Sequence, residues 1–274
     1  MQPWTVKYRP KDSSEIQGQD KSVKKLKDYI KNYSKQKKKA ALVYGPPGSG
    51  KTASVYAIAN ELDYEIVEIN ASDVRNKQGI RDKLGSAIYQ QSLFSRSKII
   101  LVDEIDGLSG RKDRGGVSEI KTLIKDSTFP VIMTANDAYD SKLNKLRRKS
   151  KMIEFNALNY RSVRAVLKRI CEKENIKAEE LAVTALARRS GGDLRGAITD
   201  LQTLAQGTKS LTRDDVNELS GRKQQESIFK ALVKVLKSTN PKIALGAFND
   251  VNEDFDEIML WLDENIPREY KKTK

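Results

Sequence analysis

The stretch AALVYGPPGSGKTASVYAIANEL, residues 40–62, decides the fold. Its first five residues are apolar, its middle matches G-x-x-x-x-G-K-[ST] at residues 45–52, and a helical pattern follows. Strand, glycine-rich loop and helix in this order predict a phosphate-binding loop, because the glycines let successive backbone N–H groups face an anion at the positive end of the helix dipole. In such a loop Lys51 reaches the β- and γ-phosphates, and the hydroxyl of Thr52 binds Mg²⁺. An ordinary Gly/Pro turn is the alternative, and the flanking strand and helix disfavour it.

Further apolar runs alternate with helical patterns through the first 155 residues. They are short and rich in β-branched residues, as the buried strands of a parallel sheet are. With the first run included, the predicted strands are Ala40–Tyr44, Glu65–Ile69, Lys98–Val102, Pro130–Thr134 and Lys151–Phe155. Alternating strands and helices predict an α/β doubly wound layer.

The rest of the chain has a helical pattern. Four apolar residues lie at positions i, i+3, i+4 and i+7 of an amphipathic helix, namely Val163, Val166, Leu167 and Ile170. Acidic residues at 214 and 215 favour a helix start, and another helical segment is expected near residue 224. We therefore predict an α/β domain over residues 1–157, a helical domain over 158–221 and a further helical segment over 222–274.

Composition excludes several classes of protein. The chain has 274 residues, of which 51 are Lys or Arg and 37 are Asp or Glu, so its net charge of +14 points to an anionic partner. The sequence contains no histidine, which excludes Ser-His-Asp hydrolysis, Cys-His proteolysis and His-ligated metal. Its one cysteine, Cys171, has no partner in the chain for a disulfide or a zinc cluster, which favours a reducing compartment. The apolar runs are too short to cross a membrane, and the first residues lack the apolar stretch of a signal peptide.

Polar residues follow two of the predicted strands. Asp103 would hold Mg²⁺, and Glu104 would orient and polarise an attacking water. Asn136 ends the next strand, where its amide would sense the γ-phosphate; a turn asparagine is the equal alternative. Arg195 lies early in a helix of the second part and would fold back onto the γ-phosphate, whereas the alternative is a solvent-exposed arginine.

Six motifs stand in the order found in one known family. They are WTVKYRPK (4–11), GPPGSGKT (45–52), NASDVRN (70–76), VDEIDG (102–107), TAN (134–136) and GGDLRGAI (191–198). Together they resemble replication factor C, the clamp loader of archaea and eukaryotes and a branch of the AAA+ ATPases. The resemblance covers residues 1 to about 220 almost continuously. Residues 103–120 and the stretch WLDENIP (261–267) resemble the large subunit of the family.

The resemblance implies a fold and a site. The fold is an AAA+ RecA-like parallel-sheet domain, a small helical lid domain and the beginning of a helical collar. The implied cofactors are ATP and Mg²⁺, with ATP hydrolysed between neighbouring subunits. The matching ATP-site residues are Val6, Tyr8, Arg9, Pro10, Gly45, Pro46, Pro47, Gly48, Ser49, Gly50, Lys51, Thr52, Asn136 and Arg195. Glu104, Lys51, Asn136 and Arg195 are the expected catalytic group, and Thr52 and Asp103 are the expected Mg²⁺ ligands.

The resemblance also implies partners: one large with four small subunits, a sliding clamp and primer–template DNA, with no membrane. ATP would tighten the subunits into a spiral that opens the clamp, and hydrolysis would release the closed clamp on DNA. The candidates for contact with the DNA backbone are Arg75, Lys77, Arg81, Arg111, Lys112 and Arg114, against the alternative of solvated loop charges. Leu93 and Phe94 are clamp candidates, against the alternative of a buried helix end. The implied location is the cytoplasm near the nucleoid, or the nucleus in a eukaryote.

One segment departs from the small-subunit pattern. Small subunits carry a Ser-Arg-Cys motif whose arginine reaches the neighbour's ATP site, and here Lys149 stands at the position of that arginine. Lysine cannot reproduce a bidentate guanidinium contact, so the chain is expected to receive an arginine finger without supplying one. Arg147 or Arg148 would substitute after a one-residue slip. Large subunits usually continue well beyond this length, so we expect a truncated chain or an unusually short natural form.

Two other functions fit part of the pattern. Another AAA+ machine, such as a replication initiator, helicase loader or branch-migration helicase, would share the phosphate loop and DEID but not WTVKYRP together with NASDVRN. An ATP-binding scaffold subunit with little hydrolysis is the other alternative. Intact Glu104, Lys51 and Asn136 argue against it.

Overall fold

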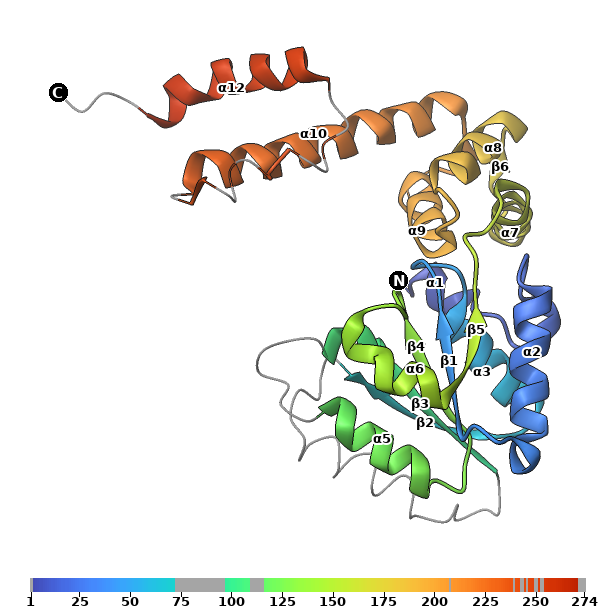
Figure 1. Cartoon of the computed structure of the whole chain (residues 1–274). Coiled ribbons are helices and arrows are strands. Elements are labelled where there is room, and N and C mark those ends of the chain that lie inside the picture. Colours follow the sequence, from blue (N-terminus) through green and yellow to red (C-terminus); the bar gives the residue numbers. More distant parts are fainter. Residues whose placement is uncertain are drawn as a thin grey trace.

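The computed structural model describes residues 2–71, 97–108, 116–206, 208–238, 240, 241, 244, 246–248, 251 and 254–270. Figure 1 shows an α/β part below a group of helices, with a long helical arm leading away. The helices are α1 (Trp4–Lys7), α2 (Asp20–Lys31), α3 (Lys51–Glu61), α5 (Gly116–Asp126), α6 (Asn144–Lys149), α7 (Tyr160–Glu174), α8 (Glu180–Arg189), α9 (Leu194–Ala205), α10 (Arg213–Lys237) and α12 (Phe255–Glu269). Short 3₁₀ turns cover Ser13–Glu15, Tyr33–Lys35, Ile105–Leu108 and Ser141–Leu143.

Within the part of the chain that the structure describes, the central sheet has five strands in the order β2-β3-β4-β1-β5, and all the pairs are parallel. The strands are β1 (Ala40–Tyr44), β2 (Glu65–Asn70), β3 (Lys98–Asp103), β4 (Val131–Ala135) and β5 (Ser150–Glu154). All five predicted strands are confirmed, with ends that differ by one residue at most. Because the strands are parallel, their carboxyl ends meet at one edge of the sheet, where α/β proteins bind ligands.

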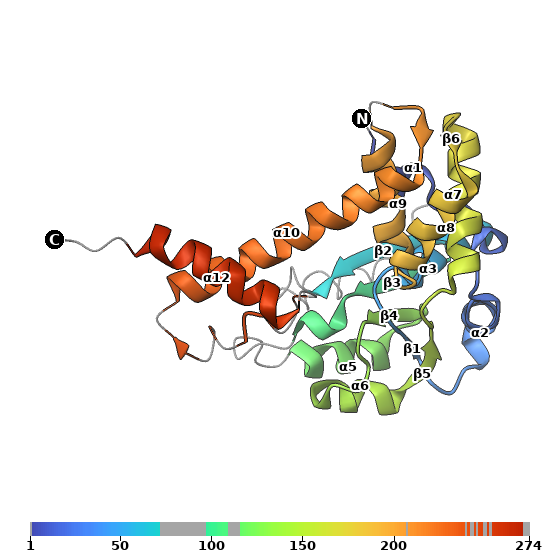
Figure 2. The same cartoon turned by 90° about the horizontal axis from the view of Figure 1, so that it is seen from above.

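Helices cover both faces of this sheet (Figure 2). On one face α2 and α3 pack their apolar side chains on the strands, with Leu26 and Ile58 fully buried. On the other face α5 and α6 do the same, through Ile120 and Leu146. Two faces of apolar packing explain why the strands are nearly continuous apolar runs, and the α/β prediction is confirmed.

The second part is helical, as predicted. Helices α7, α8 and α9 share one core that contains all four residues of the predicted amphipathic helix. A small parallel ladder of β6 (Lys177–Ala178) and β7 (Ser210–Leu211) lies beside them. The sequence suggested a second helix start near residue 224, but α10 runs unbroken from Arg213 to Lys237. A single Gly221 costs a helix only about 1 kcal/mol, so it does not end one. The boundaries at 157 and 221 stay predictions.

Helix α10 begins with a capping box. The hydroxyl of Thr212 accepts from the backbone N–H of Asp215, and the Asp215 carboxylate accepts from the backbone N–H of Thr212 at 2.7 Å. Helix α12 lies beside the far half of α10 in both views, and Phe229 meets Trp261 edge to face with ring centroids 5.3 Å apart. Among the helices that the structure describes, none is long and apolar enough to cross a membrane.

The N-terminal segment is fastened at one end to the helical part. Trp4 is buried in the core of α7, α8 and α9, and its backbone N–H donates to Gln202 Oε1 at 2.8 Å. The Lys7 ammonium pairs with Glu174 Oε1 at 2.6 Å, and the Tyr8 hydroxyl donates to the same oxygen. Helix α1 therefore belongs to the core of α7, α8 and α9, although it is the first helix in the chain.

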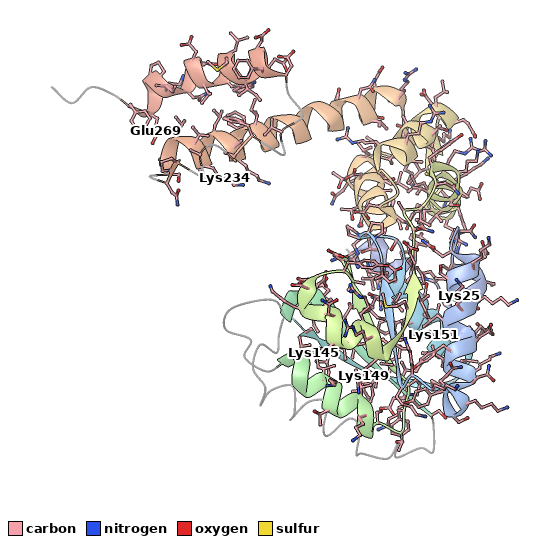
Figure 3. The ribbon with its side chains drawn as sticks, in the orientation of Figure 1. Lys25, Lys145, Lys149, Lys151, Lys234 and Glu269 are labelled. Atoms are coloured by element: carbon pink, nitrogen blue, oxygen red, sulfur yellow. The ribbon has the colours of Figure 1, made fainter. Side chains whose placement is uncertain are left out.

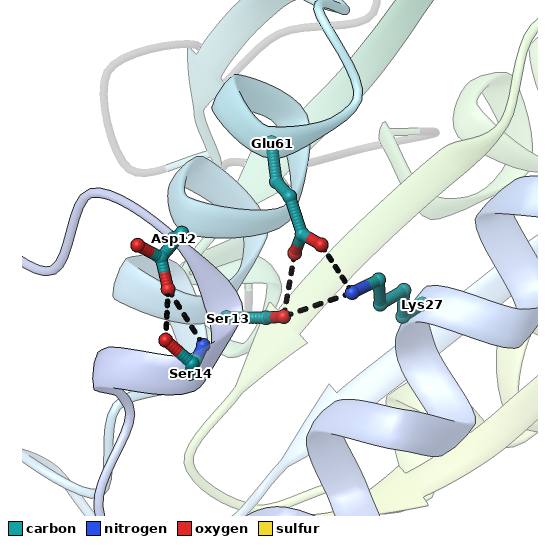
Figure 4. A network of polar contacts seen from close by, with 5 residues as sticks. All are labelled: Asp12, Ser13, Ser14, Lys27 and Glu61. Atoms are coloured by element: carbon teal, nitrogen blue, oxygen red, sulfur yellow. Dashed lines mark hydrogen bonds and ion pairs between the residues drawn. The ribbon is translucent and has the colours of Figure 1, made fainter.

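A second fastening holds the following residues to the α/β part (Figure 4). Ser13 Oγ donates to Glu61 Oε2 at 2.5 Å, at the end of α3. The Lys27 ammonium of α2 pairs with the same carboxylate and donates to Ser13 Oγ at 3.1 Å. Asp12 caps the 3₁₀ turn by accepting from the backbone N–H of Ser14 at 2.8 Å. Through Ser13, these bonds tie residues 12–14 to two helices of the sheet domain.

The Glu61 carboxylate gives a pH test of this fastening. Its hydrogen bonds with Lys27 and Ser13 lower the pKa of Glu61 below its ordinary value of 4.5. A carboxyl with a depressed pKa in the folded state stabilises the fold above its unfolded pKa, and the effect is lost as the pH falls through the folded value. We therefore expect Glu61→Gln to lower the free energy of unfolding at pH 7 by about 1 kcal/mol or less, and by a shrinking amount below pH 4.5.

Urea denaturation at pH 7 and at pH 4 and below measures this difference. Glu172→Gln, at an exposed position of α7, is the matched control and should change neither curve. An equal loss for Glu61→Gln at all these pH values would contradict the ion pair as its cause.

Candidate nucleotide-binding site

The phosphate loop, residues 45–50, joins β1 to α3 at the carboxyl edge of the sheet. Gly45 has φ +145° and Gly50 has φ +94°, both in backbone regions that favour glycine. A Cβ on Gly45 would lie 1.8 Å from the carbonyl oxygen of Phe155, whereas a Cβ on Gly50 would meet nothing within 4 Å. The loop therefore packs against the end of β5 at its first glycine and is open at its last.

Lys51, the first residue of α3, is buried with 9% of its surface exposed. Its ammonium donates to Gly45 O at 2.7 Å, to Pro46 O at 2.9 Å and to Asn136 Oδ1 at 3.0 Å. Burial lowers the pKa of Lys51, and the carboxylates of Asp106 and Asp103 oppose this shift. The ammonium thus ties the loop to the end of β4.

Asp103 ends β3 beside the loop. Its Oδ1 accepts from Thr52 Oγ1 at 2.9 Å and also from the hydroxyl of Thr134 on β4. Among the described residues no group of three or more His, Cys, Asp or Glu side chains is placed to hold a metal ion. Thr52 and Asp103 nevertheless present two hard oxygen donors side by side, which fits Mg²⁺, since this ion takes one or two protein ligands and fills the rest with water and phosphate oxygens.

Glu104 and Asn136 stand at the ends of neighbouring strands. Glu104 has φ +54°, and its backbone N–H donates to Thr134 Oγ1 at 3.0 Å. The backbone N–H of Asn136 donates to Asp106 Oδ2 at 2.8 Å. Asp106 Oδ1 is buried and has no hydrogen-bond partner among the described residues. Thr134 and Asp106 are functional candidates that sequence reasoning missed, although Asp106 lies within the quoted DEID and Thr134 within the quoted TAN.

These residues surround one cavity of about 340 Å³. The predicted site residues that line it are Val6, Tyr8, Arg9, Pro10, Pro47, Gly48, Ser49, Gly50, Lys51, Thr52, Asp103, Glu104, Asn136 and Arg195. Gly45 and Pro46 were predicted to bind ATP but are not in the lining; their carbonyl oxygens bind Lys51. The cavity thus brings residues 6–10 and Arg195, which are far apart in the sequence, to the phosphate loop.

The helical part closes the cavity over the loop. The backbone N–H of Leu194 donates to Gly48 O at 3.2 Å. Asp193 caps α9 by accepting from Gly196 N at 2.9 Å, and a Cβ on Gly48 would lie 1.7 Å from Asp193 Oδ1. Arg195 follows in the first turn of α9 and faces the cavity with an exposed side chain. The lid therefore touches the loop backbone directly.

The lining also includes residues that were not predicted as site residues, among them the apolar Ile16, Leu158, Val166 and Ile198 and the basic Arg169. They come from three separate segments, so only the fold brings them together. Helical spacing predicted Val166 as core, and that same face also lines the cavity.

In the segment that departs from the small-subunit pattern, Arg147 contacts its own chain. Arg147 Nη1 donates to Ala138 O at 3.3 Å, and its guanidinium lies 4.9 Å from the ring centroid of Tyr139. Arg148 and Lys149 are exposed, and Figure 3 shows Lys149 near Lys145 on the outer surface of α6. Which of them acts on a neighbour stays a prediction. The DNA candidates Arg75, Lys77, Arg81, Arg111, Lys112 and Arg114 and the clamp candidates Leu93 and Phe94 lie outside the described residues.

Comparison with protein families agrees with this geometry. Residues 41–159 match the ATPase family associated with various cellular activities (AAA), and residues 165–206 match the RCF1/5-like AAA+ ATPase lid domain. The structure of the Thermotoga maritima RuvB Holliday junction branch migration motor has the same fold, with a TM-score of 0.64 at 18% identity over 97% of this chain and 99% of that one. The chain is an AAA+ protein with a nucleotide-binding site.

Relatives define the branch within that class. The chain is 49% identical to the replication factor C large subunit of Nanoarchaeum equitans and 45% identical to that of Staphylothermus marinus, over 98% of its length in both cases. It is 43% identical over its whole length to the one from Methanococcus maripaludis strain C6. It spans 63%, 64% and 57% of the length of these relatives. The chain belongs to the replication factor C large-subunit family.

The two glycines at the ends of the loop allow a matched test. Alanine at either position is strained by its positive φ, at a cost of about 1–3 kcal/mol. Only Gly45→Ala adds a collision with a backbone atom, the Phe155 oxygen, so the loop or β5 must shift. We expect Gly45→Ala to lower the melting temperature more than Gly50→Ala and to weaken ATP binding at least tenfold.

Thermal denaturation and titration with a fluorescent ATP analogue measure the two effects. Equal losses for both variants would mean that backbone strain alone, and not the packing of the loop on β5, sets the cost.

Proposed function

We propose that the chain is the ATP-hydrolysing large subunit of a clamp loader, which acts with small subunits to open a sliding clamp and place it on primer–template DNA. One observation carries the proposal. A single cavity is lined by the phosphate loop, two strand-end carboxylates, Asn136 and a lid arginine. The chain that contains it is 49% identical to a replication factor C large subunit.

The cavity has groups that would bind both the phosphates and the adenine of ATP. The backbone N–H groups of the loop and the first turn of α3 would hold the phosphates, with the helix dipole adding favourable charge. Lys51 would donate to the β- and γ-phosphates, in exchange for part of its present bonds to Gly45, Pro46 and Asn136. The apolar residues of the lining, including Val6, would hold the adenine.

Thr52 and Asp103 would hold the Mg²⁺ that accompanies ATP. When bound, this ion supplies positive charge that offsets the negative charge developing on the phosphate oxygens. The chain's own part is to fix the two oxygens, and their hydrogen bond of 2.9 Å already does so.

Hydrolysis needs a water in line with the γ-phosphorus. Glu104, exposed at the end of β3, would accept a proton from that water as its oxygen bonds to phosphorus and the bond to the bridging oxygen of ADP breaks. Asn136 would orient the water and the γ-phosphate, and Arg195 would neutralise charge on the same group. A neighbouring subunit would add an arginine to this site, whereas this chain, with Lys149 at the position of that arginine, would supply none to its own neighbour.

The assembly we propose is one large with four small subunits, wrapped on DNA inside the spiral. The basic candidates at residues 75–81 and 111–114 would follow the phosphate backbone, and Leu93 with Phe94 would touch the clamp. Because Arg147 is fastened to its own chain, Arg148 and Lys149 are better placed to reach outward.

The carboxylate of Glu104 provides the central test. We expect Glu104→Gln to bind ATP within about threefold of the wild type and to lower the rate of ATP hydrolysis by about 100-fold or more, because the amide cannot accept the proton. The assay is phosphate release by the chain mixed with clamp, primed DNA and small subunits whose own catalytic carboxylates are replaced by amides, so that only the site of this chain is measured. The variant should also hold the open clamp complex longer.

Glu172→Gln, outside the cavity, is the control and should hydrolyse ATP as the wild type does. Unchanged hydrolysis by Glu104→Gln would refute the role of this residue. If the wild-type mixture binds ATP but DNA and clamp do not stimulate turnover, the chain is an ATP-binding scaffold instead of an enzyme.

A further inference from the structure

Thr134 is a polar side chain inside the central sheet. It lies on β4 with 2% of its surface exposed, next to Met133 and Ala135, which are also buried. A buried hydroxyl is costly unless it is hydrogen-bonded, so its partners show what it does in the fold.

The Thr134 hydroxyl has partners in both carboxylate residues of the site. It donates its one proton to Asp103 Oδ1, and its oxygen accepts from the backbone N–H of Glu104 at 3.0 Å. The parallel register explains this position, because Val102 pairs with Met133 and the next residues along, Asp103 and Thr134, therefore lie opposite each other.

Each partner needs such a contact. Glu104 leaves the strand with φ +54°, a left-handed conformation that a residue with a side chain adopts only when its surroundings hold it there. Asp103 Oδ1 accepts from Thr52 Oγ1 as well as from Thr134, so the carboxylate is held from two sides. One hydroxyl thus sets the direction of the Glu104 backbone and the orientation of the Asp103 carboxylate.

We propose that Thr134 is a positioning residue for ATP hydrolysis, which aligns Asp103 for the metal ion and Glu104 for the attacking water without touching either. The inference rests on the proposed function. A threonine suits the task because its branched Cβ restricts χ1 within a strand, so the hydroxyl is aimed before ligand binds.

Three variants separate the hydroxyl from the shape of the side chain. Thr134→Val keeps the shape and removes the hydroxyl, Thr134→Ser keeps the hydroxyl, and Thr134→Cys replaces it with a longer and weaker donor. Thr184→Val is the matched control, because the Thr184 hydroxyl bonds Glu180 O at 2.8 Å on α8, away from the cavity lining. Circular dichroism and the melting temperature establish that each variant is folded.

The first measurement is ATP hydrolysis by the chain with clamp, primed DNA and small subunits whose own catalytic carboxylates are replaced by amides, so that only the site of this chain is measured. We expect Thr134→Val to lower kcat about 100-fold while KM for ATP changes less than threefold, and Thr134→Ser to stay within about fivefold of the wild type. The second measurement is binding of mant-ATP to the chain alone, in EDTA and in Mg²⁺. We expect Thr134→Val to bind mant-ATP in EDTA as tightly as the wild type does. The factor by which Mg²⁺ increases the affinity should be about tenfold smaller in the variant.

The outcomes discriminate. A Thr134→Val variant with wild-type kcat and wild-type dependence on Mg²⁺ overturns the inference, even if its melting temperature falls, because the hydroxyl would then be structural only. If Thr134→Val does not fold, the comparison of Thr134→Ser with Thr134→Cys decides, and equal kcat for the two overturns it. A wild-type mixture that binds mant-ATP but does not hydrolyse ATP contradicts the proposed function alone, and the Mg²⁺ dependence of binding then still tests Thr134.

Discussion

The rest of the site depends on the hydrogen bonds of the buried Lys51 ammonium. A charge with so little exposed surface is stable only if its N–H groups all find acceptors, and here the acceptors are Gly45 O, Pro46 O and Asn136 Oδ1. Two of them require the loop to curl back at a glycine, against the oxygen of Phe155. The third requires β4 to lie directly beside β1 in parallel register. The strand order and the loop conformation therefore together supply the acceptors for the Lys51 ammonium.

The N-terminal segment joins the two parts of the chain across the cavity. Trp4 and Tyr8 are held by the helical part, whereas Ser13 is held by Glu61 of the sheet domain. The change of attachment falls near Arg9, whose guanidinium lies 4.6 Å from the ring centroid of Tyr56 on α3. A movement of α7–α9 relative to the sheet would pull on this segment from one end only. The part of the cavity wall that Val6, Tyr8 and Arg9 form would then change shape with the lid.

The sequence predicted what local pattern determines. The strands, the phosphate loop and the DEID motif follow from runs of side chains and from short motifs, and the structure places most of the loop, with Asp103 and Glu104, in the lining of one cavity. Thr134 and Ile16 were missed because their roles arise from strand register and from packing between distant segments. Gly45 and Pro46 show the converse, since the motif marks them for phosphate while their carbonyls in this structure bind Lys51. The continuity of α10 was missed because local signals for a helix start do not say whether a preceding helix has ended.

The hydrogen-bond donors around the expected phosphate position differ from those around the expected metal position. Asp103 accepts from the neutral hydroxyls of Thr52 and Thr134, which orient the carboxylate and leave its negative charge intact. A lysine or arginine in their place would also orient it, but would compete with a divalent cation for the same oxygens. Lys51 is nearby, but its ammonium donates to carbonyl and amide oxygens instead. Positive side chains thus stand where phosphate is expected, and neutral donors stand where a metal ion is expected. This arrangement lets one small cavity favour both a polyphosphate and its cation.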